Sequence, residues 1–177
     1  MKNKYILTSV LSIFALTGVV NAQTGSGTLG VTATVQGSVN LTFVTNASGL
    51  AVTGTGTSTA SLPFGNVQMY GGTVPANVTK TVTGVASFSL ATPFDVRVDL
   101  ANSASATYVL TALLATADGT NVWLIGATDI SASGTASNLT STGAYATAVP
   151  YTLKITIPAS EAAGLITNSI GFTAVGN

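Results

Sequence analysis

Hydrophobic and polar residues alternate one for one through several short stretches of this chain. In residues 94–100, Asp95, Arg97 and Asp99 alternate with apolar residues, and residues 151–157 repeat the pattern. Successive side chains of a β-strand point to opposite faces, so this alternation predicts strands with one buried and one solvated face. No segment combines a sustained 3.6-residue apolar period with good helix formers. The expected fold is therefore all-β, with almost no helix.

Short strands of this kind, separated by turn residues, are typical of an antiparallel β-sandwich. Asp118-Gly119 lies between the β-patterned residues 108–115 and 121–127, and this dipeptide predicts a hairpin turn. Trp123 has apolar neighbours on both sides and is expected inside the domain. The apolar residues expected to share the core are Phe94, Val96, Val98, Leu100, Leu153, Ile155, Ile170 and Phe172.

The first 22 residues have the three parts of a secretory signal peptide. A basic start precedes a mainly apolar run, residues 5–20, and Val20-Asn21-Ala22 provides a small-residue exit. Cleavage after Ala22 would release residues 23–177, in which no segment approaches the length of a membrane-spanning helix. We therefore expect an exported protein with no integral membrane segment in its mature chain.

The composition removes most kinds of chemistry. The mature chain would keep three basic residues against five acidic ones, so it lacks the clustered Lys and Arg that bind a nucleic-acid backbone. The chain has no histidine and no cysteine, which excludes a Ser-His pair, a catalytic thiol and the usual zinc ligands. We therefore expect no catalytic residue, no cofactor, no metal site and no enzymatic activity.

Four apolar residues share one face of a predicted extended segment near the mature N-terminus, behind a glycine-rich leader: Leu29, Val31, Ala33 and Val35. A register shift of one residue would turn the whole row outward. Two arrangements are open. Either residues 23–35 pair within their own sheet as an ordinary first strand, or they leave their own domain and complete the sheet of a neighbouring molecule.

Three segments together resemble a known family. They are the alternating residues 25–35, the Leu-Pro-Phe-Gly-Asn-Val sequence of residues 62–67, and the closing residues 163–173. They are similar to fimbrial subunits of the chaperone-usher type and to the related spore-coat-U-like secreted proteins. The resemblance implies an incomplete immunoglobulin-like sandwich whose missing last strand is supplied by the N-terminal extension of the next subunit. The chain departs from the family in having no disulfide, and in having Gly176 where a tyrosine is customary.

The resemblance implies a structural subunit of an extracellular fimbria, pilus-like fibre or surface layer that reaches the cell surface through the periplasm. It divides the chain into a signal peptide (1–22), a donor strand (23–35) and a β-sandwich domain (36–177). The implied partners are further copies of the chain, a periplasmic chaperone and an outer-membrane usher. The implied interface residues are Leu29, Val31, Ala33 and Val35 on the donor strand, and Ile166, Ile170 and Phe172 in the acceptor groove.

A secreted carbohydrate-binding or adhesive module is the alternative function. Such a module would stack sugar rings on exposed aromatic side chains. The candidate aromatic residues are Trp123, Tyr70, Tyr108 and Tyr145.

Overall fold

The computed structural model describes residues 28–132 and 134–177. The predicted signal peptide and the first part of the predicted donor strand, residues 23–27, lie outside the described residues. The chain divides into two units, residues 1–34 and 35–177, and the second unit contains the strands described below. The described residues form no helix, and therefore none that is long and apolar enough to cross a membrane.

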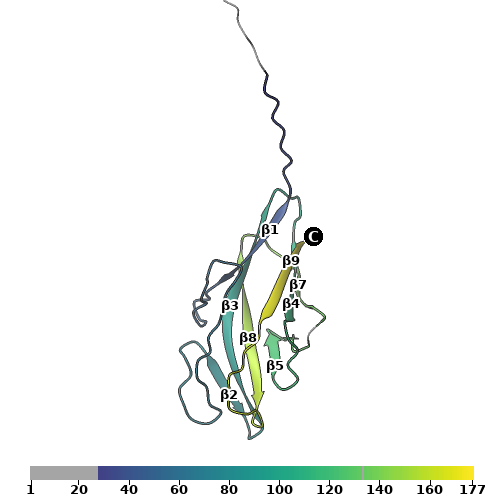
Figure 1. The fold of residues 1–177 in the computed structure, drawn as a ribbon. Helices are drawn as coiled ribbons and strands as arrows, with labels where there is room; N and C mark the ends of the chain where they lie inside the picture. Colours follow the sequence, from purple (N-terminus) through teal and green to yellow (C-terminus); the bar gives the residue numbers. More distant parts are fainter. Residues whose placement is uncertain (1–27, 133) are drawn as a thin grey trace, which may run out of the picture. The chain divides into compact units, whose positions relative to one another are not determined.

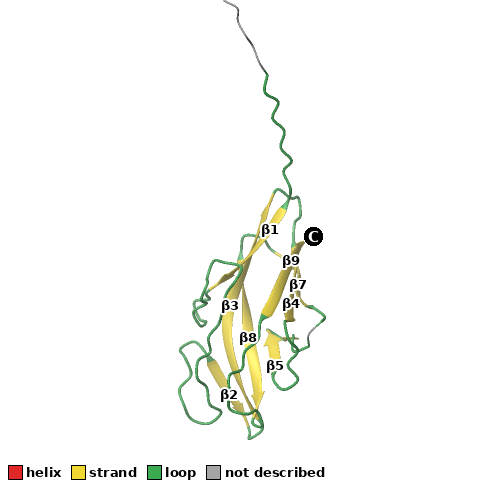
Figure 2. Ribbon diagram, viewed as in Figure 1, coloured by secondary structure: helices red, strands yellow, loops and turns green. Residues whose placement is uncertain are grey.

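The described part of residues 35–177 is built from strands joined by turns and long irregular segments (Figures 1 and 2). In three of these strands, buried side chains alternate one for one with mostly half-buried side chains over much of the strand, which is the period that the sequence predicts. The strands are β1 (Ser38–Val44), β2 (Thr79–Thr83), β3 (Ser87–Ala101), β4 (Tyr108–Leu114), β5 (Val122–Ile125), β6 (Thr128–Asp129), β7 (Ser137–Gly143), β8 (Ala148–Pro158) and β9 (Ile170–Gly176).

The strands form two antiparallel sheets. The larger sheet has the order β1-β3-β8-β5-β6, and β2 also pairs with β3. The smaller sheet has the order β7-β4-β9. Apolar residues of β3, β8 and β4 belong to one core cluster between the sheets. This arrangement confirms the predicted all-β antiparallel sandwich.

The long strand β3 organises the larger sheet. Its residues 95–101 pair with β1 and its residues 87–91 pair with β2, while its other edge pairs with β8. The alternation along β3 has the predicted sense, because Val96 and Val98 are fully buried and Arg97 is exposed. The two halves of β3 therefore carry different neighbours on one edge, and β1 covers only the half that ends at Ala101.

Most of the predicted core residues are buried. Leu100, Ile170 and Phe172 are only half-buried. Ile170 and Phe172 lie on β9, an edge strand, and pack against the core from its margin. The buried ones are Phe94, Val96, Val98, Leu153 and Ile155.

The hairpin predicted at Asp118-Gly119 is wrong. The residues before this turn form β4 in the smaller sheet, and the residues after it form β5 in the larger sheet. The Asp118 carboxylate accepts hydrogen bonds from the backbone N–H groups of Thr120 and Asn121, at 3.0 and 2.8 Å. Aspartate and glycine are favoured in many kinds of turn, so the dipeptide does not distinguish a hairpin from this crossing between sheets.

Candidate strand-binding groove

Two edge strands border an open groove between the sheets. Among the described strands β1 pairs only with β3 and β9 only with β4, so each has an edge without a strand partner. The narrow part of the groove, between β1 and β9, is a cavity of about 400 Å³. Phe43 of β1 and Phe172 of β9 meet edge to face there, with ring centroids 5.1 Å apart. Side chains therefore close the narrow part, although no described strand pairs with β1 or β9 across it.

The unpaired edge of β1 is shorter than that of β9. The Phe43 N–H donates to the Thr57 carbonyl at 2.9 Å, and the Phe43 carbonyl accepts from the Gly56 N–H at 2.7 Å. A turn thus occupies the outer edge of β1 at this point. Along β9, the described backbone hydrogen bonds go to β4 and its flanking residues on one side only. An added strand would therefore find its longest row of free backbone groups on β9.

The groove widens into a second cavity of about 1100 Å³. The two cavities share Phe43, Ser58, Ile170 and Phe172, so they form one continuous groove. The floor of the wide part is the inner face of the larger sheet, which the smaller sheet leaves uncovered here. The floor residues are Leu90, Phe94, Trp123, Leu153, Ile155 and Ile157.

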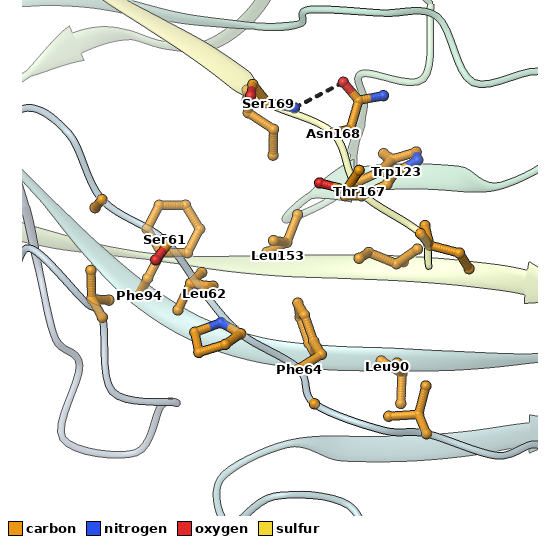
Figure 3. A pocket seen from close by; sticks show the side chains of 18 of the residues that line it. Ser61, Leu62, Phe64, Leu90, Phe94, Trp123, Leu153, Thr167, Asn168 and Ser169 are labelled. Carbon is orange, nitrogen blue, oxygen red and sulfur yellow. Dashed lines mark hydrogen bonds between the residues drawn. The ribbon is translucent and has the colours of Figure 1, made fainter. Parts of the chain in front are cut away.

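Two irregular segments wall the wide part of the groove. One is residues 58–68, from which Leu62 and Phe64 pack against the core. The other is residues 164–169, which lead into β9. Figure 3 shows Leu62, Phe64 and Leu153 directed into the space between these two segments.

The second wall is fastened to the end of β4. The Asn168 amide donates to the Thr116 carbonyl at 2.8 Å, and its oxygen accepts from the Thr116 and Ser169 N–H groups. The Ala115 N–H donates to the Ser169 carbonyl at 2.8 Å. These bonds pair the Asn168 side chain and the Ser169 carbonyl with the end of β4. The floor of the groove is apolar, while its walls also carry polar residues such as Ser61, Gln68 and Thr167. None of the described residues that line either cavity is charged.

Trp123 forms part of the floor, and its polar atom is hydrogen-bonded to the turn before β5. Its indole N–H donates to Asp118 Oδ2 at 2.8 Å. Burial alone would raise the pKa of the Asp118 carboxyl, but hydrogen bonds from Asn121, Trp123 and Thr120 outweigh it and lower this pKa to about 2. The charged carboxylate therefore anchors the indole, and Trp123 is buried as the sequence predicts.

The three predicted acceptor residues line the groove together. Ile166 lies on the second wall, and Ile170 and Phe172 follow on β9, where their side chains point inward. All three are half-buried, as expected at the edge of an open groove. No role in the groove was predicted for the floor or for the first wall, although residues 62–67 contribute to the family resemblance. The alternation of Leu62 and Phe64 with Pro63 and Gly65 is a signal that could have indicated the first wall.

The predicted donor residues lie in a segment without regular structure. Residues 28–37 form no strand, and Leu29 and Val31 are 88% and 81% exposed. Ala33 and Val35 are exposed as well. The ordinary first strand, which is one of the two predicted arrangements, is therefore absent from the described part of this segment. The row instead consists of apolar side chains that lack a buried environment.

The aromatic residues of the alternative sugar-binding function do not form a common exposed surface. Trp123 and Tyr108 are buried, and Tyr145 is half-buried with its ring centroid 5.3 Å from that of Tyr108. Tyr70, on the loop before β2, is exposed. The buried rings cannot offer a face to a sugar without rearrangement of the domain.

Comparisons with protein-family models, with curated proteins and with solved structures found no match to this chain.

Proposed function

We propose that this chain is a non-catalytic structural subunit of an extracellular fibre. Its subunits join when the N-terminal segment of one copy occupies the groove of the next. The main support is the groove between β1 and β9, which combines the free edge of β9 with an uncharged lining and an apolar floor. An unpaired strand edge readily accepts another strand, and apolar pockets beside it bind alternate side chains of that strand.

The N-terminal segment has the matching properties. Leu29, Val31, Ala33 and Val35 recur at every second position, so an extended backbone would present all four to one face. Their exposure is unfavourable in water, and burial in a groove would remove it. The free edge of β9 would supply backbone partners to the same segment. The N-terminal segment therefore has apolar side chains that need burial, and the groove has the apolar floor and the free strand edge that could bind them.

The interface proposed here would be heterologous, because one copy contributes a segment and the other a groove. A heterologous contact that does not close into a ring generates an open filament. Every copy carries both halves, so a single kind of chain is enough to build the fibre. A periplasmic chaperone and an outer-membrane usher remain predictions from the family resemblance.

Filament formation by the purified full chain, followed by electron microscopy and light scattering, tests the proposal. Val31→Asp would place an unpaired charge in the groove and should abolish filaments, since such burial is very costly. Thr32→Asp adds the same charge to the opposite face of the segment and should leave filaments intact. A synthetic peptide of residues 23–37, added in excess, should occupy free grooves and shorten the filaments.

Two results would overturn the proposal. One is a chain that stays monomeric under every assembly condition. The other is a Val31→Asp chain that polymerises as well as the Thr32→Asp chain while the peptide has no effect on filament length. Circular dichroism of each variant verifies that the β-sandwich is still formed.

A further inference from the structure

We infer, on the basis of the proposed function, a direction and a register for the inserted strand. A second copy of this chain enters antiparallel to β9, with its Leu29 opposite Ile170 and its Val35 opposite Gly164. The inserted segment then follows β9 and continues along the second wall of the groove. The proposed function requires only that the segment binds, so this arrangement goes beyond it.

The changing width of the groove supports the register. Directly opposite residues in an antiparallel pair share a face, so Leu29 would point inward together with Ile170. The next inward residues, Val31, Ala33 and Val35, would then lie along the wide cavity of about 1100 Å³. The apolar row therefore meets the part of the groove that has apolar volume to fill.

The glycine-rich leader matches the narrow part in the same register. Gly27 would come opposite Phe172, and Gly25 opposite Ala174. Phe172 already contacts Phe43 at this point, and little space remains for an inward side chain. Glycine has no side chain and allows a backbone to approach closely. A row shifted so that Val31 or Val35 faced Phe172 would have to displace the aromatic contact.

The inserted segment and the chain segment that it would pair with have the same length. Residues 23–35 number 13, and so do residues 164–176, which comprise the second wall and β9. Fully extended, both segments would span about 43 Å. The inserted strand would thus run from the end of β9 to the far end of the wide cavity, and neither segment would extend beyond the other.

The exit of the inserted strand leads to an end of the domain that carries two exposed apolar side chains. This end consists of residues 84–86 and 159–165, which are held side by side by a hydrogen bond from the Ala159 N–H to the Ala86 carbonyl at 2.8 Å. Val85 and Leu165 are 82% and 90% exposed there. Contact with another domain at this end would remove both side chains from water, which is favourable.

The donor's own domain must follow directly. Only Gln36 and Gly37 separate Val35 from β1, so the three chain steps from Val35 to Ser38 span at most roughly 10 Å. A Cβ on Gly37 would lie 3.1 Å from the Asn102 carbonyl oxygen, so the backbone already runs close against that loop. The next domain would therefore rest on residues 84–86 and 159–165, and Val85 and Leu165 would be covered.

Disulfide cross-linking tests the register cleanly, because the chain has no cysteine of its own. Three full-length double variants combine Val35→Cys with Gly164→Cys, with Ile170→Cys or with Ala174→Cys. A disulfide requires Cα atoms within about 7 Å, so each acceptor position reports a different placement of Val35. The Gly164 pair reports the inferred register, the Ile170 pair an antiparallel strand confined to β9, and the Ala174 pair a parallel strand.

After assembly and mild oxidation, the Gly164 pair should give a ladder of linked subunits on a non-reducing gel, with loss of the monomer band. The other two pairs should stay monomeric under the same conditions. A ladder from the Ile170 or Ala174 pair, or none from any pair in chains that form filaments, would overturn the register. Strand donation itself is judged separately, by shortening of wild-type filaments with the 23–37 peptide.

Discussion

Phe43 on β1 and Phe172 on β9 pack edge to face, 5.1 Å apart, although their strands form no ladder with each other in the described chain. Phe94 joins the cluster, with ring centroids 5.9 Å from Phe172 and 6.4 Å from Phe43. Aromatic pairs of this kind contribute about 0.5–1.5 kcal/mol each beyond their buried area. Side-chain packing therefore holds the two sheets together at the narrow part of the groove and leaves the edge of β9 available.

The inward face of β9 should be sensitive to charge, and the outward face should not. Ile170→Asp would place a carboxylate at the junction of the two cavities and should prevent filament formation, because an inserted apolar strand would bury that charge. Val175→Asp lies on the same strand but is 58% exposed on the opposite face, and should assemble normally. Electron microscopy and light scattering measure both outcomes.

The Ile170 variant also requires a folding control, since Ile170 packs against the core. Its far-UV circular dichroism and melting transition show whether the domain is intact. If a folded Ile170→Asp chain formed filaments as readily as wild type, the groove would not be the acceptor site.

The ring of Tyr108 packs directly against Gly143 and leaves no room for a side chain there, so a side chain at residue 143 should destabilise the domain. A Cβ there would overlap the fully buried Tyr108 ring, which also packs against Tyr145. Gly143→Ala should therefore cost about 1–3 kcal/mol in the free energy of unfolding. Urea unfolding, followed by the fluorescence of Trp123, measures this change.

Gly119→Ala is the matched control for that substitution. A Cβ on Gly119 meets no atom within 4 Å, and its φ is not positive. The replacement should be neutral or stabilising by about 0.4–1 kcal/mol, because alanine restricts the unfolded chain. Equal effects of the two alanines would show that the overlap with Tyr108 is relieved at no cost.

The fold class followed from the sequence because alternation is a local property. Val96 and Val98 are buried and Arg97 is exposed, which the period of two residues in this strand is sufficient to predict. The hairpin at Asp118 was wrong for a related reason. The local turn signal was real, but the partner of each neighbouring strand is set by packing across the whole domain.

The groove was only partly predictable. Ile166, Ile170 and Phe172 were predicted from the resemblance of the closing segment to fimbrial subunits, and all three line the groove. Residues 58–68 and 164–169, by contrast, have no regular strand, and their place as walls depends on tertiary bonds such as those between Asn168 and Thr116. No periodicity in the sequence encodes such bonds.

The stability of the domain should fall in acid through Asp118. Burial raises the pKa of its carboxyl, but hydrogen bonds from Asn121, Trp123 and Thr120 outweigh burial and lower this pKa from the ordinary value of 3.8 to about 2. A carboxyl with a lowered folded pKa contributes stability above its unfolded pKa, and this contribution is lost as the pH falls through the folded pKa. The melting temperature should therefore stay level from pH 7 to about 5 and fall between about pH 4 and 2.

Asp118→Asn isolates this contribution. The amide would direct N–H groups at the Trp123 and Asn121 donors, so at pH 7 the variant should lose about 1–2 kcal/mol of unfolding free energy. Near pH 2 the wild-type carboxyl is partly protonated, and the difference in stability between the wild-type and Asp118→Asn proteins should become smaller. Thermal melts of both chains at matched pH values measure it. A gap that is the same at pH 7 and pH 2 would show that the charge of Asp118 does not anchor Trp123.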